Sequence, residues 1–320
     1  MTMKNSLFKC LATMLLSASC SVAFSYPTKP VTIVVPAPPG GTADTVVRSI
    51  SARLTAALGQ PVVIENKPGA GGVIASQYVA GAPADGYTLL MNYTSHAINP
   101  WLMAKLPYDT ASSFVPVAML GTVPLLLAVP ATGEKSAAEL IADARKNPGT
   151  LSYGTSATGG ASHLGGELFS QLTGGKLLMV PYKGGAAAAA DLAAGRISML
   201  LDTKLALAPL QQANRIRFLG VASEKRSAVF PELEPVGELL PGFEATAWYG
   251  IVAPAGTPAP VVEQLNAEIN RALQDPAISK PLIDQGFEPR AVSSAAWGSF
   301  MGQETRRWGA LIQKANLKAQ

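Results

Sequence analysis

Cysteine and histidine are nearly absent from this chain of 320 residues. Both cysteines, Cys10 and Cys20, lie within the first 20 residues, so the rest of the chain has no thiol for a disulfide, a zinc thiolate site or a nucleophile. Only two histidines occur, and the chain contains no HExxH, CxxC or EF-hand pattern. The sequence therefore predicts neither a metal site nor a cofactor.

Charge is also scarce. Charged residues make up 14% of the chain, whereas soluble domains typically contain about 25%. The formal net charge is +4, and no run of five or more lysines and arginines occurs. Binding to nucleic acid depends on clustered basic residues, so the sequence argues against a nucleic-acid partner. Neither a Walker A sequence nor a GxSxG elbow is present, and the glycine run at 69–74 lacks the third glycine of a dinucleotide fingerprint.

Residues 1–25 have the features of a secretory signal. Lys4 and Lys9 give a positive start, the stretch Leu11–Ala18 is apolar, and small residues stand at positions −3 and −1 of a cut before Tyr26. The apolar stretch is shorter than the roughly 20 residues that span a bilayer. The sequence predicts that this signal is cleaved and that the mature chain is exported to the periplasm.

A lipid anchor on Cys20 is the alternative to release into the periplasm. The three residues before it, 17–19, are Ser, Ala and Ser, and none provides the larger aliphatic side chain expected three positions before a lipid-modified cysteine. No later segment reaches membrane-spanning length without proline, glycine or charge. We therefore expect the free form.

Short β-branched or aliphatic runs alternate with longer helical patterns almost throughout the chain. This alternation predicts an α/β fold with open, mostly parallel sheets flanked by helices. The runs are continuous rather than alternating, which is typical of buried parallel strands. We expect strands at 31–35, 62–65, 88–91, 125–129, 177–180, 197–201, 216–221 and 248–253, and helices at 43–58, 136–147, 162–173, 185–194, 204–214, 259–274 and 294–315.

Two segments are suited to carry the chain from one lobe to another. Residues 114–130 are rich in aliphatic residues and interrupted by proline and glycine, and residues 242–254 precede the helical C-terminus. Two crossings predict a body of two lobes with a cleft between them. Lobe 1 is expected to contain residues 26–124 and 251–320, and lobe 2 residues 125–250.

Five loops share one design, in which small residues and hydroxyls lie between a strand end and a helix start. Such loops let a ligand approach the backbone, and the helix start adds N–H donors and a partial positive charge. At the carboxyl ends of strands in an open sheet they are placed to hold a small carboxylate. The five loops are Pro36–Thr45, Asn66–Val73, Asn92–Asn99, Gly154–His163 and Tyr182–Ala186.

Several residues in these loops have a second possible role besides ligand binding. Asp44 is as well suited to cap a helix start as to contact a ligand. Tyr93 and Tyr182 could be aromatic residues of the rim, and Lys183 a solvated surface charge. Only the tertiary structure distinguishes these roles.

A serine hydrolase is a further alternative. Ser156 and Ser162 lie close in sequence to His163, as a nucleophile and its general base would. No aspartate stands nearby to orient the histidine, and such pairs arise easily by chance. We therefore expect no catalytic residues.

The motifs of these loops, taken in order, resemble those of the Bug family, the solute receptors of tripartite tricarboxylate transporters. The resemblance covers essentially the whole chain after the signal. Its motifs are Pro36 with Gly40-Gly41-Thr42-Ala43-Asp44, Glu65-Asn66-Lys67-Pro68-Gly69-Ala70-Gly71-Gly72, Asp85-Gly86-Tyr87-Thr88, His96-Ala97-Ile98-Asn99-Pro100, Val180-Pro181-Tyr182-Lys183-Gly184-Gly185, Asp191-Leu192 and Ala253-Pro254-Ala255-Gly256-Thr257-Pro258.

The resemblance implies a two-lobed periplasmic binding protein of type II-like fold. Such a protein is a monomer without cofactor or enzymatic activity, and it closes on a small carboxylate: a di- or tricarboxylate, an aromatic acid or an amino acid. Its partners would be the membrane subunits of a transporter or, alternatively, a membrane sensor. The ligand-binding residues implied here are Gly40, Gly41, Thr42, Asp44, Tyr93, Thr94, Ser95, Thr155, Ser156, Gly160, Ser162, His163, Tyr182, Lys183, Gly184 and Asp202.

The sequence departs from the family pattern at several positions. Ala37 stands where an aromatic residue usually follows the first proline, which should widen that wall of the cleft. Asn214 replaces a common glycine, a mild change because asparagine also tolerates a left-handed turn. The identity of the ligand is therefore left open by the sequence.

Overall fold

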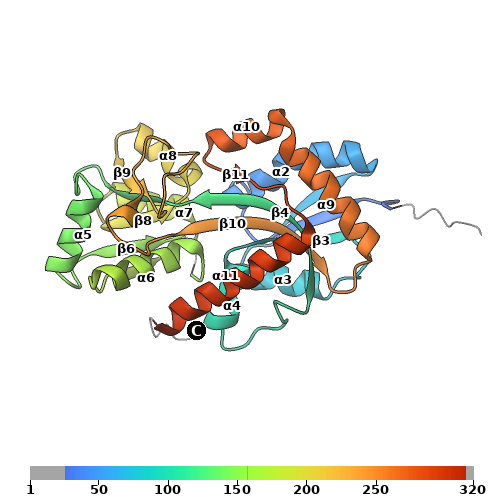
Figure 1. Ribbon diagram of the computed structural model, residues 1–320, viewed down its shortest axis with the longest axis horizontal. Helices are drawn as coiled ribbons and strands as arrows, with labels where there is room; N and C mark the ends of the chain where they lie inside the picture. Colours follow the sequence, from blue (N-terminus) through green and yellow to red (C-terminus); the bar gives the residue numbers. More distant parts are fainter. Residues whose placement is uncertain (1–25, 157, 315–320) are drawn as a thin grey trace, which may run out of the picture.

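The computed structural model describes residues 26–156 and 158–314, which form two α/β lobes. The N-terminal strands and C-terminal helices build the first lobe, and the middle of the chain builds the second (Figure 1). The predicted secretory signal, with Cys10 and Cys20, lies outside the described residues. The helices are α2 (Thr42–Leu58), α3 (Val73–Ala80), α4 (Ser95–Leu102), α5 (Ala137–Lys146), α6 (Ala161–Thr173), α7 (Gly185–Ala193), α8 (Lys204–Gln212), α9 (Ala259–Gln274), α10 (Pro276–Asp284) and α11 (Ser294–Lys314), with short 3-10 turns at Ala70–Gly72 and Val236–Glu238.

The sheet of the first lobe mixes strand directions. β1 pairs in parallel with β2 and β3, whereas β10 pairs antiparallel with both β3 and β4, and β11 pairs antiparallel with β4. Helix α11 crosses this lobe, and helices α2 and α9 lie beside each other in it (Figure 1). The strand order is β11 (Glu288–Pro289), β4 (Phe114–Pro124), β10 (Thr246–Pro254), β3 (Thr88–Tyr93), β1 (Val31–Val35) and β2 (Val62–Asn66).

The sheet of the second lobe is mixed in the same way. β6 pairs in parallel with β7 and β8, but β5 pairs antiparallel with β8 and β9. The α/β class and the two lobes are confirmed, and the expectation of mostly parallel sheets is corrected, because a continuous apolar run reports burial on both faces and not strand direction. The strand order is β7 (Leu178–Pro181), β6 (Ser152–Thr155), β8 (Met199–Asp202), β5 (Leu126–Pro130) and β9 (Ile216–Val221).

Strands β4 and β10 extend across the middle of the molecule and connect the lobes (Figure 1). Between β4 and β5 only Leu125 intervenes. Its N–H donates to the carbonyl of Ala245 (3.1 Å), and its carbonyl accepts from the N–H of Ala222 (2.8 Å). The N–H of Ala245 also donates to the carbonyl of Ala222 (2.9 Å). These three hydrogen bonds join the segment that leaves the first lobe to the segment that returns to it.

Several elements were absent from the sequence prediction. The segment taken as a crossing contains β4, the longest strand described, whose run is interrupted by Pro116, Gly121 and Pro124. The short β6 lies in a glycine-rich stretch, and α4 contains Pro100. Helices α3 and α10 were also missed, because α3 directly follows a glycine-rich loop and α10 contains Pro276 and Pro281, and glycine and proline are the usual signals of a loop.

Helix α11 is anchored to the connecting strand β10 through buried tryptophans. Trp248 of β10 and Trp297 of α11 meet edge to face with ring centroids 5.2 Å apart. Oε2 of the buried Glu304 accepts from the indole N–H groups of Trp248 (3.1 Å) and Trp308 (2.9 Å). An added Cβ at Gly250 would lie 2.2 Å from the Trp297 ring, so only glycine allows this approach. The C-terminal helix is therefore fixed to the segment that joins the lobes.

The starts of α5 and α9 differ in their caps. Ser136 accepts from the N–H of Glu139 (3.2 Å), and the Glu139 carboxylate accepts from the N–H of Lys135. Thr257 does not cap α9, because its hydroxyl donates to the carbonyl of Pro254 (2.8 Å). Pro258 occupies the N-cap position instead.

Within the described part of the chain, no helix combines the length and the apolar character needed to cross a bilayer.

Candidate functional site

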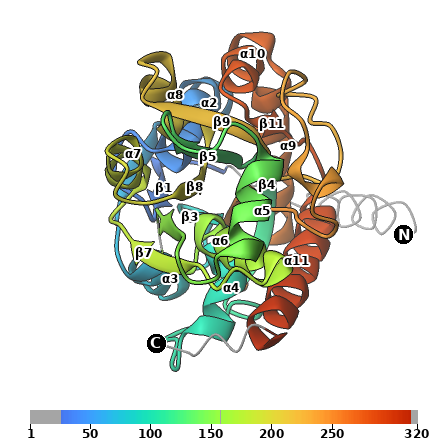
Figure 2. The ribbon, with the colours of Figure 1, turned by 90° about the vertical axis from the view of Figure 1, so that its left-hand side faces the viewer.

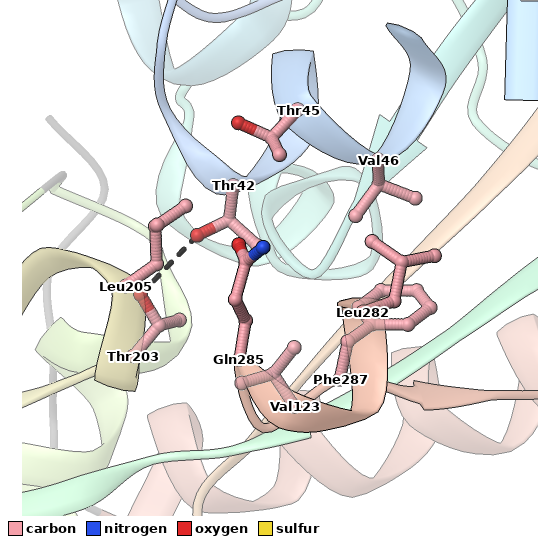
Figure 3. A pocket seen from close by; sticks show the side chains of 9 residues that line it. All are labelled: Thr42, Thr45, Val46, Val123, Thr203, Leu205, Leu282, Gln285 and Phe287. Carbon is pink, nitrogen blue, oxygen red and sulfur yellow. Dashed lines mark hydrogen bonds between the residues drawn. The ribbon is translucent and has the colours of Figure 1, made fainter. Parts of the chain in front are cut away.

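The loops at the carboxyl ends of the strands bring the two lobes into contact. Oγ1 of Thr42, at the start of α2, lies 3.2 Å from Oγ1 of Thr203, which precedes α8 (Figure 3). A cavity of about 10 Å³, room for about one water molecule, lies beside this contact and is also lined by Thr45 and Gln285 (Figure 3). Thr203 was not predicted, although it directly follows Asp202 at a predicted strand end.

A second contact between the lobes lies at the start of α6. An added Cβ at Gly71 would lie 3.4 Å from the carbonyl of Thr158, and one at Gly159 would lie 3.6 Å from Oδ1 of Asn99. Both glycines have positive φ angles, +61° and +76°. The lobes therefore approach each other closely at this point, through the backbone of Gly71 and Thr158 and through the side chain of Asn99.

The start of α2 combines predicted residues Gly40, Gly41 and Thr42. Gly40 adopts φ +82°, and Gly41 is the N-cap of α2 in an extended conformation with no side-chain cap. An added Cβ at Gly41 would have its nearest neighbour 3.8 Å away, at the carbonyl of Pro38. The first-turn amides of α2 therefore receive no side-chain cap from Gly41, and the space beside Gly41 is open.

Asp44 is held by the protein itself. Its Oδ2 accepts from the N–H of Gly40 (2.9 Å) and from Nε of Arg48 (2.8 Å), and its Oδ1 accepts from Nδ2 of Asn66 (2.9 Å). Asn66 Nδ2 also donates to the carbonyl of Ala37 (3.0 Å). Burial alone would raise the pKa of Asp44, but the hydrogen bonds from Arg48, Gly40 and Asn66 lower it below its ordinary value. Asp44 thus fixes the 36–41 loop, and the sequence did not single out its partners Arg48 and Asn66.

Tyr93, Thr94 and Ser95 join β3 to α4. The hydroxyl of Tyr93 lies 3.4 Å from the carbonyl of Pro36, and burial raises the pKa of this phenol. Thr94 is buried, and its Oγ1 accepts from the N–H of Trp248 (3.1 Å). The Thr94 side chain therefore supports the connecting strand β10 rather than capping α4, which has no side-chain cap.

In the second lobe, Gly160 is the N-cap of α6, again with no side-chain cap. Nδ1 of His163 accepts from the N–H of Gly159 (3.1 Å), and its Nε2 lies 4.0 Å from Glu167 Oε1. Burial lowers the pKa of His163 to about 4, so the imidazole is neutral at pH 7. Ser162 Oγ is buried with no hydrogen-bond partner in the described chain. Ser162 and His163, one of the pairs considered for the hydrolase alternative, are therefore not hydrogen-bonded to each other.

Tyr182, Lys183 and Gly184 lead into α7. The hydroxyl of Tyr182 donates to Asp191 Oδ2 (2.7 Å), and burial, with this carboxylate nearby, raises the pKa of Tyr182 to about 12. The N–H of Gly184 donates to the carbonyl of Ser156 (3.0 Å) and α7 has no side-chain cap. Lys183 is exposed and forms no ion pair among the residues described. Backbone from this loop reaches the neighbouring loop, whereas the Tyr182 hydroxyl is engaged by Asp191.

Asp202 ends β8 and is buried, with 7% of its surface exposed. Its Oδ1 accepts from the N–H of Thr203 (2.7 Å). Burial raises its pKa to about 6, and the Thr203 amide and the hydroxyls of Ser156 and Thr203 oppose this effect. Tyr249 of β10, which the sequence did not indicate, interacts with both Thr42 and Asp202. Asp202, Ser156, Thr203, Thr42 and Tyr249 therefore form a cluster of oxygens between the lobes.

Side-chain cations are directed away from this cluster. Arg48 in α2 binds Asp44, and Lys204 at the start of α8 donates to the carbonyl of Asp284 (3.0 Å). Among the described residues, no group of three or more His, Cys, Asp or Glu side chains is arranged to hold a metal ion. What the loops offer is amide N–H groups at helix starts, hydroxyls and one carboxylate, a set suited to binding rather than to bond breaking.

The sequence is similar to that of a known group of receptors. A sequence model of the tripartite tricarboxylate transporter family receptor matches residues 46–317. The chain belongs to this family. The protein BugT of Bordetella pertussis is 36% identical over 300 residues, which cover 92% of each chain. The Bug-family resemblance is thereby confirmed.

Two solved structures are close in fold and carry ligands. Rpa4515 of R. palustris, solved with adipate, is 38% identical with a TM-score of 0.86, covering 92% of this chain and all of its own. MatC of Rhodopseudomonas palustris, solved with malate, is 32% identical with a TM-score of 0.81, covering 90% of this chain and all of its own. These neighbours are solute-binding proteins, and the chain is a solute receptor rather than an enzyme.

Proposed function

We propose that this receptor captures a small organic carboxylate between its lobes and delivers it to the membrane subunits of a tripartite tricarboxylate transporter. The observation that carries the proposal is the set of uncapped helix starts of α2, α4, α6 and α7 at the facing loops. Their N–H groups would bind the carboxylate, while Arg48 and Lys204 are engaged by Asp44 and by the carbonyl of Asp284. Gly41, Thr42 and Gly160 are the residues that we assign to this contact, because the N–H groups of Gly40 and Gly184 already donate to Asp44 and Ser156.

The ligands of related proteins support this assignment. Adipate and malate, bound by Rpa4515 and MatC, are both dicarboxylates. Each exposed helix start contributes only about 0.3–1 kcal/mol, whereas micromolar affinity needs about 8 kcal/mol. Several loops must therefore act together, and the closed contact between Thr42 and Thr203 would exclude water around the ligand.

The lobes would close by rotating about the two crossing segments, which are hydrogen-bonded to each other at Leu125 and Ala245. The predicted boundary between residues 250 and 251 falls inside β10, which pairs with the first sheet from Thr246 onward. We therefore place the second crossing before Thr246. A ligand that touches both lobes favours the closed form by its differential affinity for that form.

The mature protein would begin at Tyr26 and act in the periplasm. Tyr26 is buried, its hydroxyl donates to the carbonyl of Gly86 (2.6 Å), and its carbonyl accepts from Gln264 (2.9 Å). A chain cut before this residue would keep these contacts, which supports the predicted cleavage site. N-terminal sequencing of the exported protein tests it, and a start at a lipid-modified Cys20 would contradict it.

Thermal unfolding with a ligand panel tests the binding function. Adipate, malate, succinate and aromatic acids should raise the melting temperature, because a ligand at 100 times its Kd adds about 2.7 kcal/mol to the stability. Their neutral diamides serve as matched controls and should have no effect. A panel in which only the neutral compounds raise the melting temperature would refute the carboxylate assignment.

A further inference from the structure

The end of helix α10 in the first lobe is a contact point for the second lobe. Nζ of Lys204, the first residue of α8, donates to the carbonyl of Asp284, the last residue of α10 (3.0 Å). Helices α8 and α10 lie next to each other at the top of both ribbon views (Figures 1 and 2). The end of α10 contains none of the residues that the family resemblance assigns to the ligand.

Lys204 is placed unfavourably for its own helix. A cation at a helix start meets the positive end of the helix dipole, whereas a cation at a helix end is stabilising. Helix α8 has no acidic residue in its first turn, and α10 has no basic residue in its last turn. The carbonyls of Leu282 and Ile283 accept backbone N–H groups, and Lys204 supplies the donor for the carbonyl that follows them. The position of Lys204 is therefore explained by its contact with α10 and not by α8.

An apolar contact lies beside this hydrogen bond. Phe230, in the loop after β9, is 1% exposed and packs with apolar residues of the second lobe. Its ring also reaches Gly286 of the first lobe, where an added Cβ would lie 2.2 Å from Cζ of Phe230. Nζ of Lys204 lies 5.7 Å from the centre of the same ring. Lys204 and Phe230 of the second lobe, with Asp284 and Gly286 of the first, thus form one contact between the lobes, the α10 contact.

The α10 contact continues the one between Thr42 and Thr203. The small cavity beside those two threonines is also lined by Leu205 of α8 and by Leu282 and Gln285 at the end of α10 (Figure 3). The start of α8 therefore meets both α2 and α10 across the gap between the lobes. These contacts can exist only while the lobes are together.

We propose that the α10 contact stabilises the arrangement in which the lobes enclose the ligand, and that Lys204 and Phe230 are positioning residues that set the affinity without touching the ligand. The inference rests on the proposed function, because it adds a direct contact between the lobes to the one made through the ligand. The apparent Kd falls as the population of the enclosing arrangement rises. Since the contact must break before the ligand leaves, its loss should act on the dissociation rate.

Lys204→Met tests the polar half of the α10 contact. Methionine keeps an unbranched side chain and removes the ammonium, so one hydrogen bond is lost. For each acid of the panel that the wild-type chain binds, among adipate, malate, succinate and aromatic acids, we expect the Kd to rise about threefold. Titration calorimetry gives the Kd, and stopped-flow tryptophan fluorescence should show the change in the dissociation rate. Lys280→Met, at an exposed position of α10, is the matched control and should change neither value.

Two further readouts of Lys204→Met separate positioning from other roles. The factor should be the same for every acid bound, because the side chain touches none of them, and the melting temperature of the ligand-free protein should not change. A factor that differs between acids would mean a ligand contact, and a lowered melting temperature would mean a general structural role. Either result, or an unchanged dissociation rate, would overturn the inference.

Gly286→Ala tests the apolar half. Its methyl group would strike the ring of Phe230 and hold the lobes apart, so affinity should fall at least about tenfold. Gly149→Ala controls for backbone strain, because Gly149 has φ +82°, close to the +83° of Gly286, and an added Cβ there meets nothing within 4 Å. Adding Phe230→Leu to Gly286→Ala removes the ring atom that clashes and should restore most of the affinity. A double variant that binds no better than Gly286→Ala would overturn the inference.

The inference and the proposed function fail in different ways. If the acids bind and both Lys204→Met and Gly286→Ala keep the wild-type affinity, the carboxylate receptor stands and the α10 contact falls. If no acid binds the wild-type chain, the proposed function is refuted, and small-angle X-ray scattering of the ligand-free protein decides on the contact. Gly286→Ala should then have a larger radius of gyration than wild type, and Gly149→Ala the same one. An unchanged radius in Gly286→Ala would overturn the inference without reference to any ligand.

Discussion

Helix starts at the facing loops differ from helix starts elsewhere in the molecule. Away from the contact between the lobes, α5 and α10 are capped by the side chains of Ser136 and Asp275, and at α11 Ser293 accepts from the N–H of Ala296. At the contact, α2, α4, α6 and α7 begin without a side-chain cap. The amides at the starts of α5, α10 and α11 thus have side-chain acceptors, whereas those at the starts of α2, α4, α6 and α7 have none.

The difference indicates what the facing loops are for. A side-chain cap typically contributes about 1 kcal/mol, so omitting it at four neighbouring helices lowers stability without structural gain. Helices α3, α8 and α9 also lack a side-chain cap, and in α9 Pro260, the second helical residue, has no N–H that would need an acceptor. Uncapped amides are useful only where another acceptor binds, and a ligand carboxylate is such an acceptor. The predictions below test whether capping and ligand binding exclude each other.

The largest effect on stability is expected for Asp202→Asn. Burial raises the pKa of Asp202 from 3.8 to about 6, so the folded state holds this proton more tightly than the unfolded state does. Ionisation therefore weakens folding as the pH rises from about 4 to about 6, and the cost remains at pH 7. The neighbouring Tyr249 stays neutral throughout, because burial raises its pKa further. The amide should stabilise the apo protein at pH 7 by about 1–3 kcal/mol.

Urea unfolding of wild type and variant at pH 4 and pH 7 measures this effect. The gain should be present at pH 7 and nearly absent at pH 4, where the wild-type carboxyl is already protonated. A gain of equal size at both pH values would mean that the ionisation of Asp202 is not its cause. Stabilisation by removal of a group would place Asp202 among residues kept for binding rather than for folding.

Gly41→Val should have the largest effect on ligand affinity. The site has φ −77° and ψ 169°, and an added Cβ has no neighbour closer than 3.8 Å, so valine should fit the fold. Its side chain would cover the amides at the start of α2 and weaken carboxylate binding by at least about tenfold, or about 1.4 kcal/mol. Gly81→Val is the matched control, with φ −90° and a nearest neighbour at 3.7 Å, away from the facing loops. Unchanged affinity in Gly41→Val would show that the ligand does not use this helix start.

Ser136→Ala tests a helix start that has a side-chain cap, that of α5. It removes the acceptor for the N–H of Glu139 and should lower the free energy of unfolding by about 1 kcal/mol. Ligand affinity should stay the same, because α5 begins away from the facing loops. Chemical denaturation and titration calorimetry on one preparation give both values. A large loss of affinity would mean that the two classes of helix start are not independent.

Gly41→Ser is expected to have the smallest effect on stability. The variant is informative because stability and ligand affinity should change in opposite directions. A serine at this N-cap position can accept from the first-turn amides, so stability should rise by roughly a few tenths of a kcal/mol. Affinity for carboxylates should fall at the same time, because the hydroxyl competes for the donors that the ligand uses. A serine variant that binds as well as wild type would break the link between missing caps and binding.

The sequence predicted a large part of the fold because strand and helix patterns are local. The run at 31–35 coincides with β1, and the left-handed turn expected at Asn214 has φ +54°. Strand direction could not be predicted in this way, since parallel and antiparallel strands with two buried faces have the same apolar pattern. The long strand β4 was missed because its proline and glycine residues are the usual signals of a loop.

For the site, the sequence indicated the loops better than the roles of their side chains. Small residues before a helix mark a place where a ligand can approach, and that property is visible in the sequence at Gly40 and Gly41. Whether Asp44 binds a ligand or the protein depended on Asn66, which lies 22 residues further on. Tyr182 likewise was predicted to bind the ligand, with a place at the rim as the alternative, and its hydroxyl donates to Asp191.

The sequence by itself determined the α/β class, the uncapped glycine-rich loops and the family, because apolar period and residue size are fixed position by position. Only the tertiary structure decided which polar atoms are satisfied and which remain available. The contact between Thr42 and Thr203 joins residues 161 positions apart, and the buried oxygen of Asp202 lies against a different helix from the one that follows it. Hydrogen bonds form between whatever groups the fold brings within about 3 Å of each other, and that proximity is a property of the packed lobes.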